Sequence, residues 1–246
     1  MRRVETQFKT CPEPMNCTSC PMLASSEWHV LKELNQARLS KAKVVQSFAK
    51  GGVIFHQGTQ HDGIYCVQSG MVGLRKTDEK GNAVLLNLIY PGQTVGMPSF
   101  FAGSEYMASA EALAPTTVCF IPGPVLTELV ANNPELDLEF LKHISRDLSE
   151  AYNTILANTS QPVRMRMAHF LLSLKDRCGI EQEAGKVVLE LPITRNDIAD
   201  LLSTRPETIA RTITALTKDG LVAFKGRKAV LLDLEALYQE SEPVES

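Results

Sequence analysis

The fold is decided by residues 194–218, which read TRNDIADLLSTRPETIARTITALTK. This stretch predicts two helices that are separated by a tight break near Ser203. Thr194, with Asp197 three residues later, is a capping signal for the first helix. Pro206 suits the first turn of the second helix, because a helix has no partner there for the N–H that proline lacks. Two short helices joined by a tight turn are typical of the helix-turn-helix, whose second helix enters the major groove of DNA.

The second helix, predicted over residues 206–219, has two chemically different faces. Three apolar residues recur at i, i+4 and i+7 and are predicted to face the core: Ile209, Ile213 and Leu216. Glu207, Ala210 and Arg211 then face outward. An arginine can donate two hydrogen bonds to guanine O6 and N7, and a glutamate can accept one from cytosine N4 or adenine N6. We therefore predict that Glu207 and Arg211 contact bases.

Residues 221–232 predict a β-hairpin with a basic turn, which is typical of a wing that lies along a phosphate backbone. Between residues 205 and 228, six cations and two anions give a charge of +4 within a chain of net charge −3. The solvated face of an ordinary helical hairpin can carry such charges, but a local basic patch on an acidic protein also fits DNA contact. The predicted DNA-contacting residues are Thr194, Arg195, Arg205, Glu207, Thr208, Ala210, Arg211, Lys225 and Arg227.

The composition fits a soluble globular protein: 246 residues, of which 44% are hydrophobic and 22% charged. No run of 18 apolar residues predicts a transmembrane helix, and the basic start of the chain is not followed by the apolar run of a secretory signal. We therefore predict a cytoplasmic protein with no membrane partner. The sequence has no nucleophile–base set and no phosphate-binding loop. It also lacks the βαβ context that a thiol redox enzyme would need around Cys17 and Cys20, so an enzyme is not favoured.

Residues 44–122 have a different texture, in which short β-rich runs alternate with glycine turns. This spacing predicts a small antiparallel barrel or sandwich. A helical pattern without internal proline or glycine follows over residues 135–158. The sequence therefore predicts an α+β protein in four parts: a cysteine-rich segment (1–24), a β-rich domain (25–133), a long helix (134–160) and a mainly helical DNA-binding domain (161–246).

The long helix carries apolar residues at alternating spacings of three and four, which is the pattern of a coiled-coil seam. The seam residues are Leu141, Ile144, Leu148, Ala151 and Ile155. The same pattern also fits a helix that packs on its own β-rich domain. The seam by itself therefore leaves both a dimer helix and an internally packed helix open.

The six cysteines are unevenly spread, with Cys11, Cys17 and Cys20 crowded near the start. Crowded cysteines in a cytosolic protein indicate metal binding or redox activity rather than a disulfide framework. Cys66 and Cys178 are predicted to be structural. Four histidines are isolated from one another and are predicted to have surface or packing roles: His56, His61, His143 and His169.

Several of these stretches resemble the family of the cyclic-AMP receptor protein and the fumarate–nitrate reductase regulator (CRP/FNR). The helix-turn-helix residues 194–211 are similar to the family's DNA-binding signature. Residues 50–58, 64–70 and 91–96 are similar to its β-roll. The resemblance covers nearly the whole chain. It implies a β-roll sensor domain, a long dimerisation helix, a winged helix-turn-helix and a homodimer that binds an inverted repeat in double-stranded DNA.

The resemblance also implies which bases are read. FNR-type members read a TTGAT-like half-site through a Glu-x-x-Ser-Arg pattern, and this chain has Glu207-x-x-Ala210-Arg211. Glu207 and Arg211 carry over, whereas Ala210 lacks the serine hydroxyl and offers only a methyl group for a thymine methyl. We therefore predict the GA core of the half-site and leave its outer bases open. An activator would also contact RNA polymerase, for which the loop at residues 77–83 is a candidate.

The signal implied by the resemblance depends on the cysteines. Cyclic-AMP receptors use a Glu and an Arg-Ser pair in their phosphate cassette. This chain lacks that Glu and has no arginine between Arg75 and Arg146, so we predict that it does not bind cyclic AMP. Cys119 is similar to the lone barrel cysteine of FNR-type oxygen sensors. With the three N-terminal cysteines, it would give the four thiolates of a 4Fe-4S cluster.

The spacing of the N-terminal cysteines is x5 then x2, the reverse of the enteric pattern, so other readings stay open. They are structural zinc, a thiol switch, no role for Cys119, or a small molecule or gas sensed in the β-roll, for example through haem. Ala151 stands where the enteric relative carries an acid. Because Ala151 adds no charge to the seam, we predict a dimer that persists without the signal.

Overall fold

The computed structural model describes residues 16–182 and 185–242. The chain divides into two compact units, and the boundary falls after Ser149, inside helix α4 (Pro134–Ser160). Helix α4 begins and ends within two residues of the predicted bounds. None of the described helices is long and apolar enough to cross a membrane.

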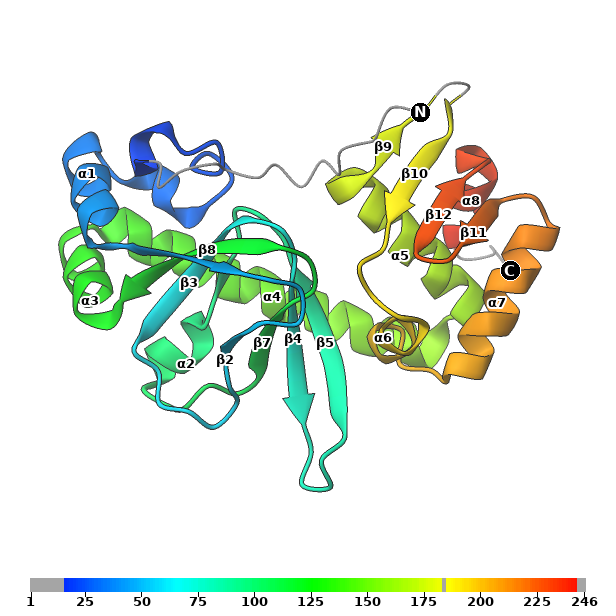
Figure 1. The fold of residues 1–246 in the computed structure, drawn as a ribbon, viewed down its shortest axis with the longest axis horizontal. Coiled ribbons are helices and arrows are strands. Elements are labelled where there is room, and N and C mark those ends of the chain that lie inside the picture. The colour runs from blue at the N-terminus through cyan, green and yellow to red at the C-terminus, as the bar shows by residue number, and fades with distance from the viewer. Residues whose placement is uncertain (1–15, 183–184, 243–246) are drawn as a thin grey trace. The chain divides into compact units, whose positions relative to one another are not determined.

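The N-terminal unit is built on two antiparallel sheets of four strands each, which confirms the predicted β-rich domain (Figure 1). One sheet has the strand order β1-β8-β3-β6 and the other has the order β2-β7-β4-β5. The strands are β1 (Val44–Phe48), β2 (Val53–Phe55), β3 (Gly63–Ser69), β4 (Val72–Thr77), β5 (Ala83–Ile89), β6 (Thr94–Val95), β7 (Ser109–Ala112) and β8 (Thr116–Pro122). The helical elements are η1 (Cys17–Ser19), η2 (Glu27–Val30), α1 (Glu33–Ala42), α2 (Met97–Ala102) and α3 (Gly123–Asn132).

One glycine turn shows why the sequence folds this way. Gly70 joins β3 to β4 with φ at 90°, a conformation that favours glycine. A Cβ at this position would lie 2.5 Å from the carbonyl oxygen of Pro115 and 2.4 Å from Oγ1 of Thr116. Any other residue would therefore have to displace backbone of the loop before β8.

Two apolar cores hold the unit together. The first includes Phe55, Val67 and Tyr106, and the Phe55 and Tyr106 rings stack with centroids 3.9 Å apart. The second lies where helices cover the β1-β8-β3-β6 sheet, and it includes Trp28 of η2 and Phe140 of α4. This second core brings the N-terminal segment, two strands and the long helix into contact.

The C-terminal unit has the predicted winged helix-turn-helix order. Its remaining elements are α5 (Val163–Cys178), β9 (Ile180–Glu181), β10 (Val187–Glu190), α6 (Arg195–Leu201), α7 (Pro206–Lys218), β11 (Val222–Lys225), β12 (Lys228–Leu231) and α8 (Leu234–Ser241). The four strands form one antiparallel sheet in the order β11-β12-β10-β9. The α+β fold class is therefore confirmed.

Candidate nucleic-acid interface and cysteine site

The helix-turn-helix begins with the predicted cap. The Asp197 N–H donates to Oγ1 of Thr194 at 3.1 Å, and the Thr194 N–H donates to Oδ2 of Asp197 at 2.7 Å, so both halves of the capping box are present. Leu202 ends α6, and Ser203 turns the chain with φ at 46°. Arg205 is the N-cap of α7 and is exposed. Local signals therefore fix the angle at which α7 leaves the turn.

Helix α7 has the two predicted faces. The side chains that anchor it are nearly or completely buried: Ile209, Ile213 and Leu216. Glu207 and Arg211 are exposed on the opposite side, and Thr208 and Ala210 are half-buried between the two faces. No ion pair among the described residues neutralises the Arg211 guanidinium, which leaves its donors available to an acceptor on DNA.

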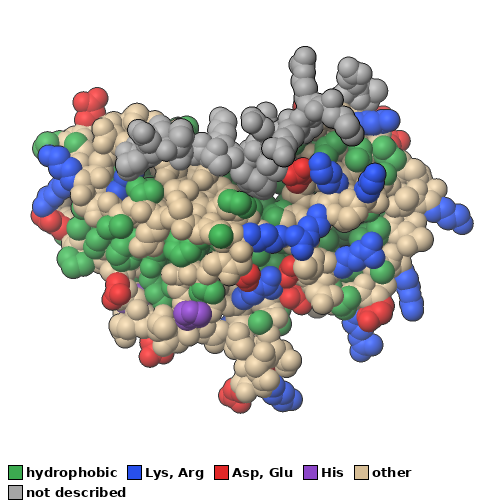
Figure 2. Space-filling view, in the orientation of Figure 1, with side chains coloured by type: hydrophobic (Ala, Val, Ile, Leu, Met, Phe, Trp, Pro, Cys, Tyr) green, Lys and Arg blue, Asp and Glu red, His purple; other side chains and the backbone are tan. Residues whose placement is uncertain are grey.

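The wing is the hairpin of β11 and β12, with Lys225 opposite Lys228 and a turn at Gly226-Arg227. Lys228 forms an ion pair with Glu190 at 2.9 Å, whereas Lys225 and Arg227 are exposed at the turn. Figure 2 shows that Lys and Arg side chains gather over this unit. The placement fits contacts to phosphate rather than to bases.

A cavity of about 220 Å³ separates the wing from α6. The residues that line it include Thr194, Arg195 and Arg227, together with apolar side chains such as Phe224. The structure thus brings three of the predicted DNA-contacting residues to the rim of one hollow. Their contacts to DNA stay a prediction.

The exposed side of α4 carries an apolar stripe. Leu141, Leu148 and Ile155, which are seven residues apart, are 61%, 51% and 60% exposed. Ala151 is exposed as well, whereas Ile144 is half-buried. The sequence analysis missed three further exposed apolar side chains on this helix: Leu138, Tyr152 and Leu156. Within the described chain no element covers these side chains, as is typical of an association surface.

A second site is formed by cysteines in the N-terminal unit. One small apolar cavity, of about 30 Å³, is lined by four thiols from three elements: Cys17 and Cys20 at η1, Cys66 on β3 and Cys119 on β8. The Cys17 N–H donates to Oγ of Ser40 on α1 at 2.5 Å, which fixes η1 against that helix. The structure therefore brings together three of the predicted ligands. Cys11 lies outside the described residues.

The thiols differ in their electrostatic surroundings because one cation lines the cavity. Burial lowers the pKa of Lys43, but the charges of Cys119, Cys17 and Cys20 and a hydrogen bond with Cys17 raise it above its ordinary value. Burial raises the pKa of Cys119, and Lys43 acts in the opposite direction. Lys43 thus interacts electrostatically with Cys17, Cys20 and Cys119, the three described thiols that were predicted as ligands.

Cys66 was predicted to be structural, and that stays a prediction, but the structure adds where it lies. It lies directly opposite Cys119 in the β3–β8 pairing and lines the same cavity. Burial, followed by the negative charge of Glu27, raises the pKa of Cys66 well above its ordinary value. Cys66 therefore favours the neutral thiol. A cysteine in a β-rich run gave no signal of this position.

The side chains around the cysteine cavity limit which metal ion or cluster it can hold. Among residues 16–182 and 185–242, no three His, Cys, Asp or Glu side chains are arranged to hold a metal ion. Trp28 also lines the cavity, and its buried Nε1–H has no acceptor in this part of the chain. A thiolate or sulfide held in the cavity would supply that acceptor. The chemistry of these donors therefore fits a sulfur-rich group, but with a cavity of about 30 Å³ either that group or a single ion would need a change in their positions.

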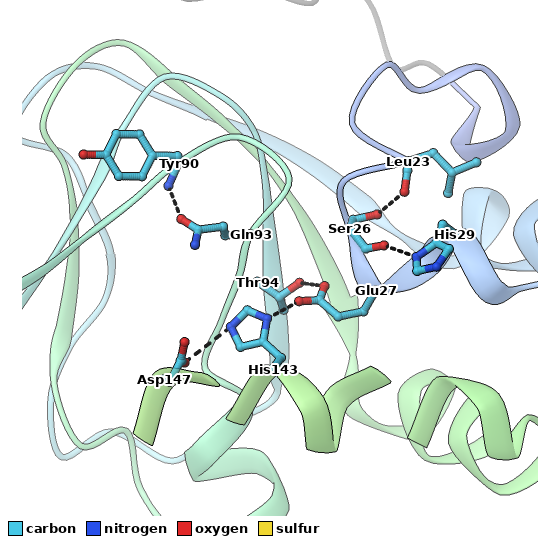
Figure 3. A network of polar contacts seen from close by, with 9 residues as sticks. All are labelled: Leu23, Ser26, Glu27, His29, Tyr90, Gln93, Thr94, His143 and Asp147. Carbon is cyan, nitrogen blue, oxygen red and sulfur yellow. Dashed lines mark hydrogen bonds and ion pairs between the residues drawn. The ribbon is translucent and has the colours of Figure 1, made fainter. Parts of the chain in front are cut away.

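A buried polar network lies beside this cavity, and the sequence analysis missed it (Figure 3). Nδ1 of His143 on α4 is hydrogen-bonded to the Glu27 carboxylate, and Oγ1 of Thr94 donates to the same carboxylate at 2.8 Å. Nε2 of His143 lies 3.3 Å from Oδ2 of Asp147. Burial lowers the pKa of His143, but the two carboxylates outweigh burial and raise it to about 9. His143 has a packing role, as predicted, but as a charged residue.

The stability of the N-terminal unit should therefore depend on pH. A histidine whose pKa is raised from 6.5 to about 9 by folding contributes fully below pH 6.5, and the contribution is lost as pH rises through 9. We expect a loss of up to about 3 kcal/mol. Urea unfolding, followed by the fluorescence of Trp28, the single tryptophan, measures it at pH 6.5 and pH 9.5. His143→Gln should remove most of this difference, and an equal difference in the variant would contradict the assignment.

Comparison with known proteins agrees with both units. Residues 45–133 match the model of the cyclic nucleotide-binding domain, and residues 165–240 match that of the Crp-like helix-turn-helix domain. The transcriptional regulator SdrP of Thermus thermophilus is 34% identical over 83% of this chain and 97% of its own length. The anaerobic regulatory protein of Pasteurella multocida is 26% identical over 78% of this chain and 70% of its own length.

A solved structure leads to the same family. The crystal structure of a CRP/FNR-family transcriptional regulator from Thermus thermophilus has a TM-score of 0.68 and 33% identity, and the match covers 81% of this chain and 99% of that one. Regulators of this family bind DNA as dimers and are not enzymes. The fold, the exposed face of α7 and these matches together show that the chain is a DNA-binding transcription regulator of the CRP/FNR family.

Proposed function

We propose that this regulator responds to oxygen or redox state through a 4Fe-4S cluster held by Cys11, Cys17, Cys20 and Cys119. The observation that carries the proposal is the cysteine cavity, where thiols more than 95 residues apart in the chain lie beside Lys43. Each thiolate of such a cluster binds a different iron atom, so the thiolates stand farther apart than those around one zinc ion. The described cysteines share a cavity but lack the arrangement for a single ion. That combination favours a cluster over zinc.

The residues around the cavity suit such a group. Lys43 would offset the negative charge of the thiolates, and Trp28 would donate a hydrogen bond to sulfur. Leu23 and Ile121 would keep water away, and solvent exposure, net charge and hydrogen bonds to sulfur are what set cluster potentials. When bound, the cluster would supply iron and sulfide that react with oxygen. The cavity of about 30 Å³ has room for only one or two water molecules. With a cluster bound, residues 17–23 would therefore lie farther from strands β3 and β8.

The name of one relative supports oxygen as the signal, because it is called an anaerobic regulatory protein. For the output, two α7 helices would read an inverted repeat with half-sites about one DNA turn apart. The α4 stripe would form the homodimer interface. Glu207 and Arg211 would read a TTGAT-like half-site, and the loop at residues 77–83 would contact RNA polymerase. Cyclic AMP is not expected to act as the signal.

A thiol switch is the second candidate, and the pairing of β3 with β8 favours it. Cys66 and Cys119 are directly opposite in that pairing, so their side chains lie on the same face of the sheet. With an oxidant such as hydrogen peroxide, the two thiols would form a disulfide and the peroxide would become two waters. This switch needs neither iron nor Cys11.

Purification without air tests the cluster. We expect iron and sulfide in equal amounts, at about four of each per chain, and a visible absorption band that fades in air. Cys119→Ser should lose most of the iron, because one of four thiolates is removed. Cys178→Ser on α5, outside the cavity, is the matched control and should keep it. Iron-free protein prepared without air would overturn the cluster and leave the thiol switch.

A further inference from the structure

The cysteine segment is joined to the polar network at α4 by a continuous series of backbone hydrogen bonds. The N–H of every third residue donates to the carbonyl three positions earlier: Cys20 to Cys17 at 3.1 Å, Leu23 to Cys20 at 3.0 Å, Ser26 to Leu23 at 3.1 Å and His29 to Ser26 at 3.3 Å. Side chains reinforce the last two steps, because Oγ of Ser26 donates to the Leu23 carbonyl at 2.9 Å and Nδ1 of His29 bonds the Ser26 carbonyl at 2.8 Å. Residues 17–29 therefore form one continuous ribbon of turns.

This ribbon is fastened to α4 at its far end. Glu27, which is only 5% exposed, is hydrogen-bonded to His143, and Thr94 holds the other carboxylate oxygen (Figure 3). Trp28 adds an apolar contact at the neighbouring position, because its ring meets that of Phe140 edge-on with centroids 5.4 Å apart. Phe140 and His143 are one helical turn apart, so both contacts hold the same short stretch of α4.

Three consecutive residues at this end of the ribbon make different contacts. Trp28 and Ser26 line the cysteine cavity, whereas Glu27 between them turns to the helix. On α4, the residues that contact the ribbon lie close in sequence to the apolar stripe. Leu141 is two residues before His143, and Ile144 is the residue after it. A displacement of residues 17–23 would therefore be carried to the part of α4 that begins the stripe.

We propose that Glu27 and His143 form a clasp that transmits the state of the cysteine cavity to the dimerisation helix. The clasp rests on the proposed function only in taking the cavity as the place where the signal is received. Breaking a buried ion pair leaves an uncompensated charge, so a displacement that separates Glu27 from His143 would destabilise this part of α4. Glu27 and His143 are positioning residues that act through α4 and touch no signal molecule.

The test displaces the ribbon without using iron. An N-ethylmaleimide adduct on the buried Cys17 is larger than the cavity of about 30 Å³, so the labelled segment is expected to move. Hydrogen exchange by mass spectrometry then compares reduced and labelled full-length protein, with the labelled positions confirmed from peptide masses. The measured quantity is the ratio of exchange rates, labelled over reduced, for residues 140–148, with residues 123–132 of α3 as the internal reference.

Wild-type protein should show a ratio of about five or more in α4 and about one in α3. Glu27→Gln and His143→Gln should each exchange fast before labelling, and their ratio should fall below about two. The matched control is Arg38→Gln, which breaks an exposed ion pair between Arg38 on α1 and Glu128 on α3 at 2.5 Å without changing the reference sequence and should keep the wild-type ratio. General loosening of the fold would also raise the exchange of the α3 reference in the unlabelled variant, whereas loss of the clasp should raise only that of α4.

Two results would overturn the clasp. One is a wild-type α4 that does not respond to labelling, and the other is a response of equal size in wild type and Glu27→Gln. Neither result depends on whether the protein contains iron, so the cluster and the clasp fail separately. If Glu27→Gln does not fold, His143→Gln gives the same comparison from the helix side.

Discussion

Arg211→Ala is expected to weaken binding to an inverted repeat with GA-containing half-sites by about 1–3 kcal/mol for each half-site. The physical reason is that an exposed guanidinium on the outward face of α7 can give two hydrogen bonds to one guanine, and alanine gives none. Fluorescence anisotropy with the duplex, at one fixed salt concentration, measures the change. On a duplex in which that guanine is replaced, the wild-type protein and Arg211→Ala should differ less in binding free energy, because neither can form the two hydrogen bonds to guanine.

Two variants separate base reading from general effects. Lys225→Ala at the wing should weaken binding to all sequences alike and should lower the salt dependence, as expected of a phosphate contact. Thr217→Ala is an exposed substitution at the far end of α7 and should change little. An Arg211→Ala variant that binds the repeat as tightly as wild type would refute the role assigned to this residue.

Leu148→Glu should have a larger effect, because it places a carboxylate in the middle of the apolar α4 stripe. Leu148 is 51% exposed within one chain, so the substitution leaves the monomer intact. In a symmetric dimer the two glutamates would be buried near each other without partners, at a cost of about 3–5 kcal/mol. We expect the dimer dissociation constant to rise by on the order of 100-fold or more, as measured by analytical ultracentrifugation.

DNA binding should fall together with the dimer, since a monomer reaches only one half-site. Asn153→Glu introduces the same charge at an exposed position of α4 that lies away from the stripe, and it should stay dimeric. If Leu148→Glu remains a dimer at nanomolar concentration, another surface forms the interface. The wild-type protein should be dimeric at micromolar concentration with or without the signal, as predicted from Ala151.

The parts of the fold that the sequence predicted are those whose signals are local. Thr194 and Asp197 are three residues apart, and the capping box they form needs no tertiary context. The buried face of α7 follows from a period of 3.6 residues. The heptad pattern of α4 likewise placed Leu141, Leu148 and Ile155 on one face of the helix, and the structure shows that this face is uncovered.

The parts that it missed depend on residues far apart in the chain. Glu27 and His143 are separated by 116 positions, so no spacing rule could pair them. Cys66 was missed for a related reason: strand pairing, rather than sequence distance, places it opposite Cys119. The heptad pattern was also too strict for α4, because Tyr152 and Leu156 widen the exposed stripe beyond the two seam positions.

The backbone conformation of Ser203 limits which residues this position can hold. It is the one non-glycine residue with positive φ in the described parts of the chain, and this backbone costs a residue with a side chain about 1–2 kcal/mol. Its hydroxyl accepts a hydrogen bond from Nδ2 of Asn158 at 2.7 Å, and Arg166 donates to the same asparagine. Selection for heat resistance alone would favour glycine at this position. Glycine would relieve this backbone strain but would lose the hydrogen bond that ties the turn before α7 to the end of α4, so stability of the turn and attachment of the DNA-reading helix make opposite demands on this residue.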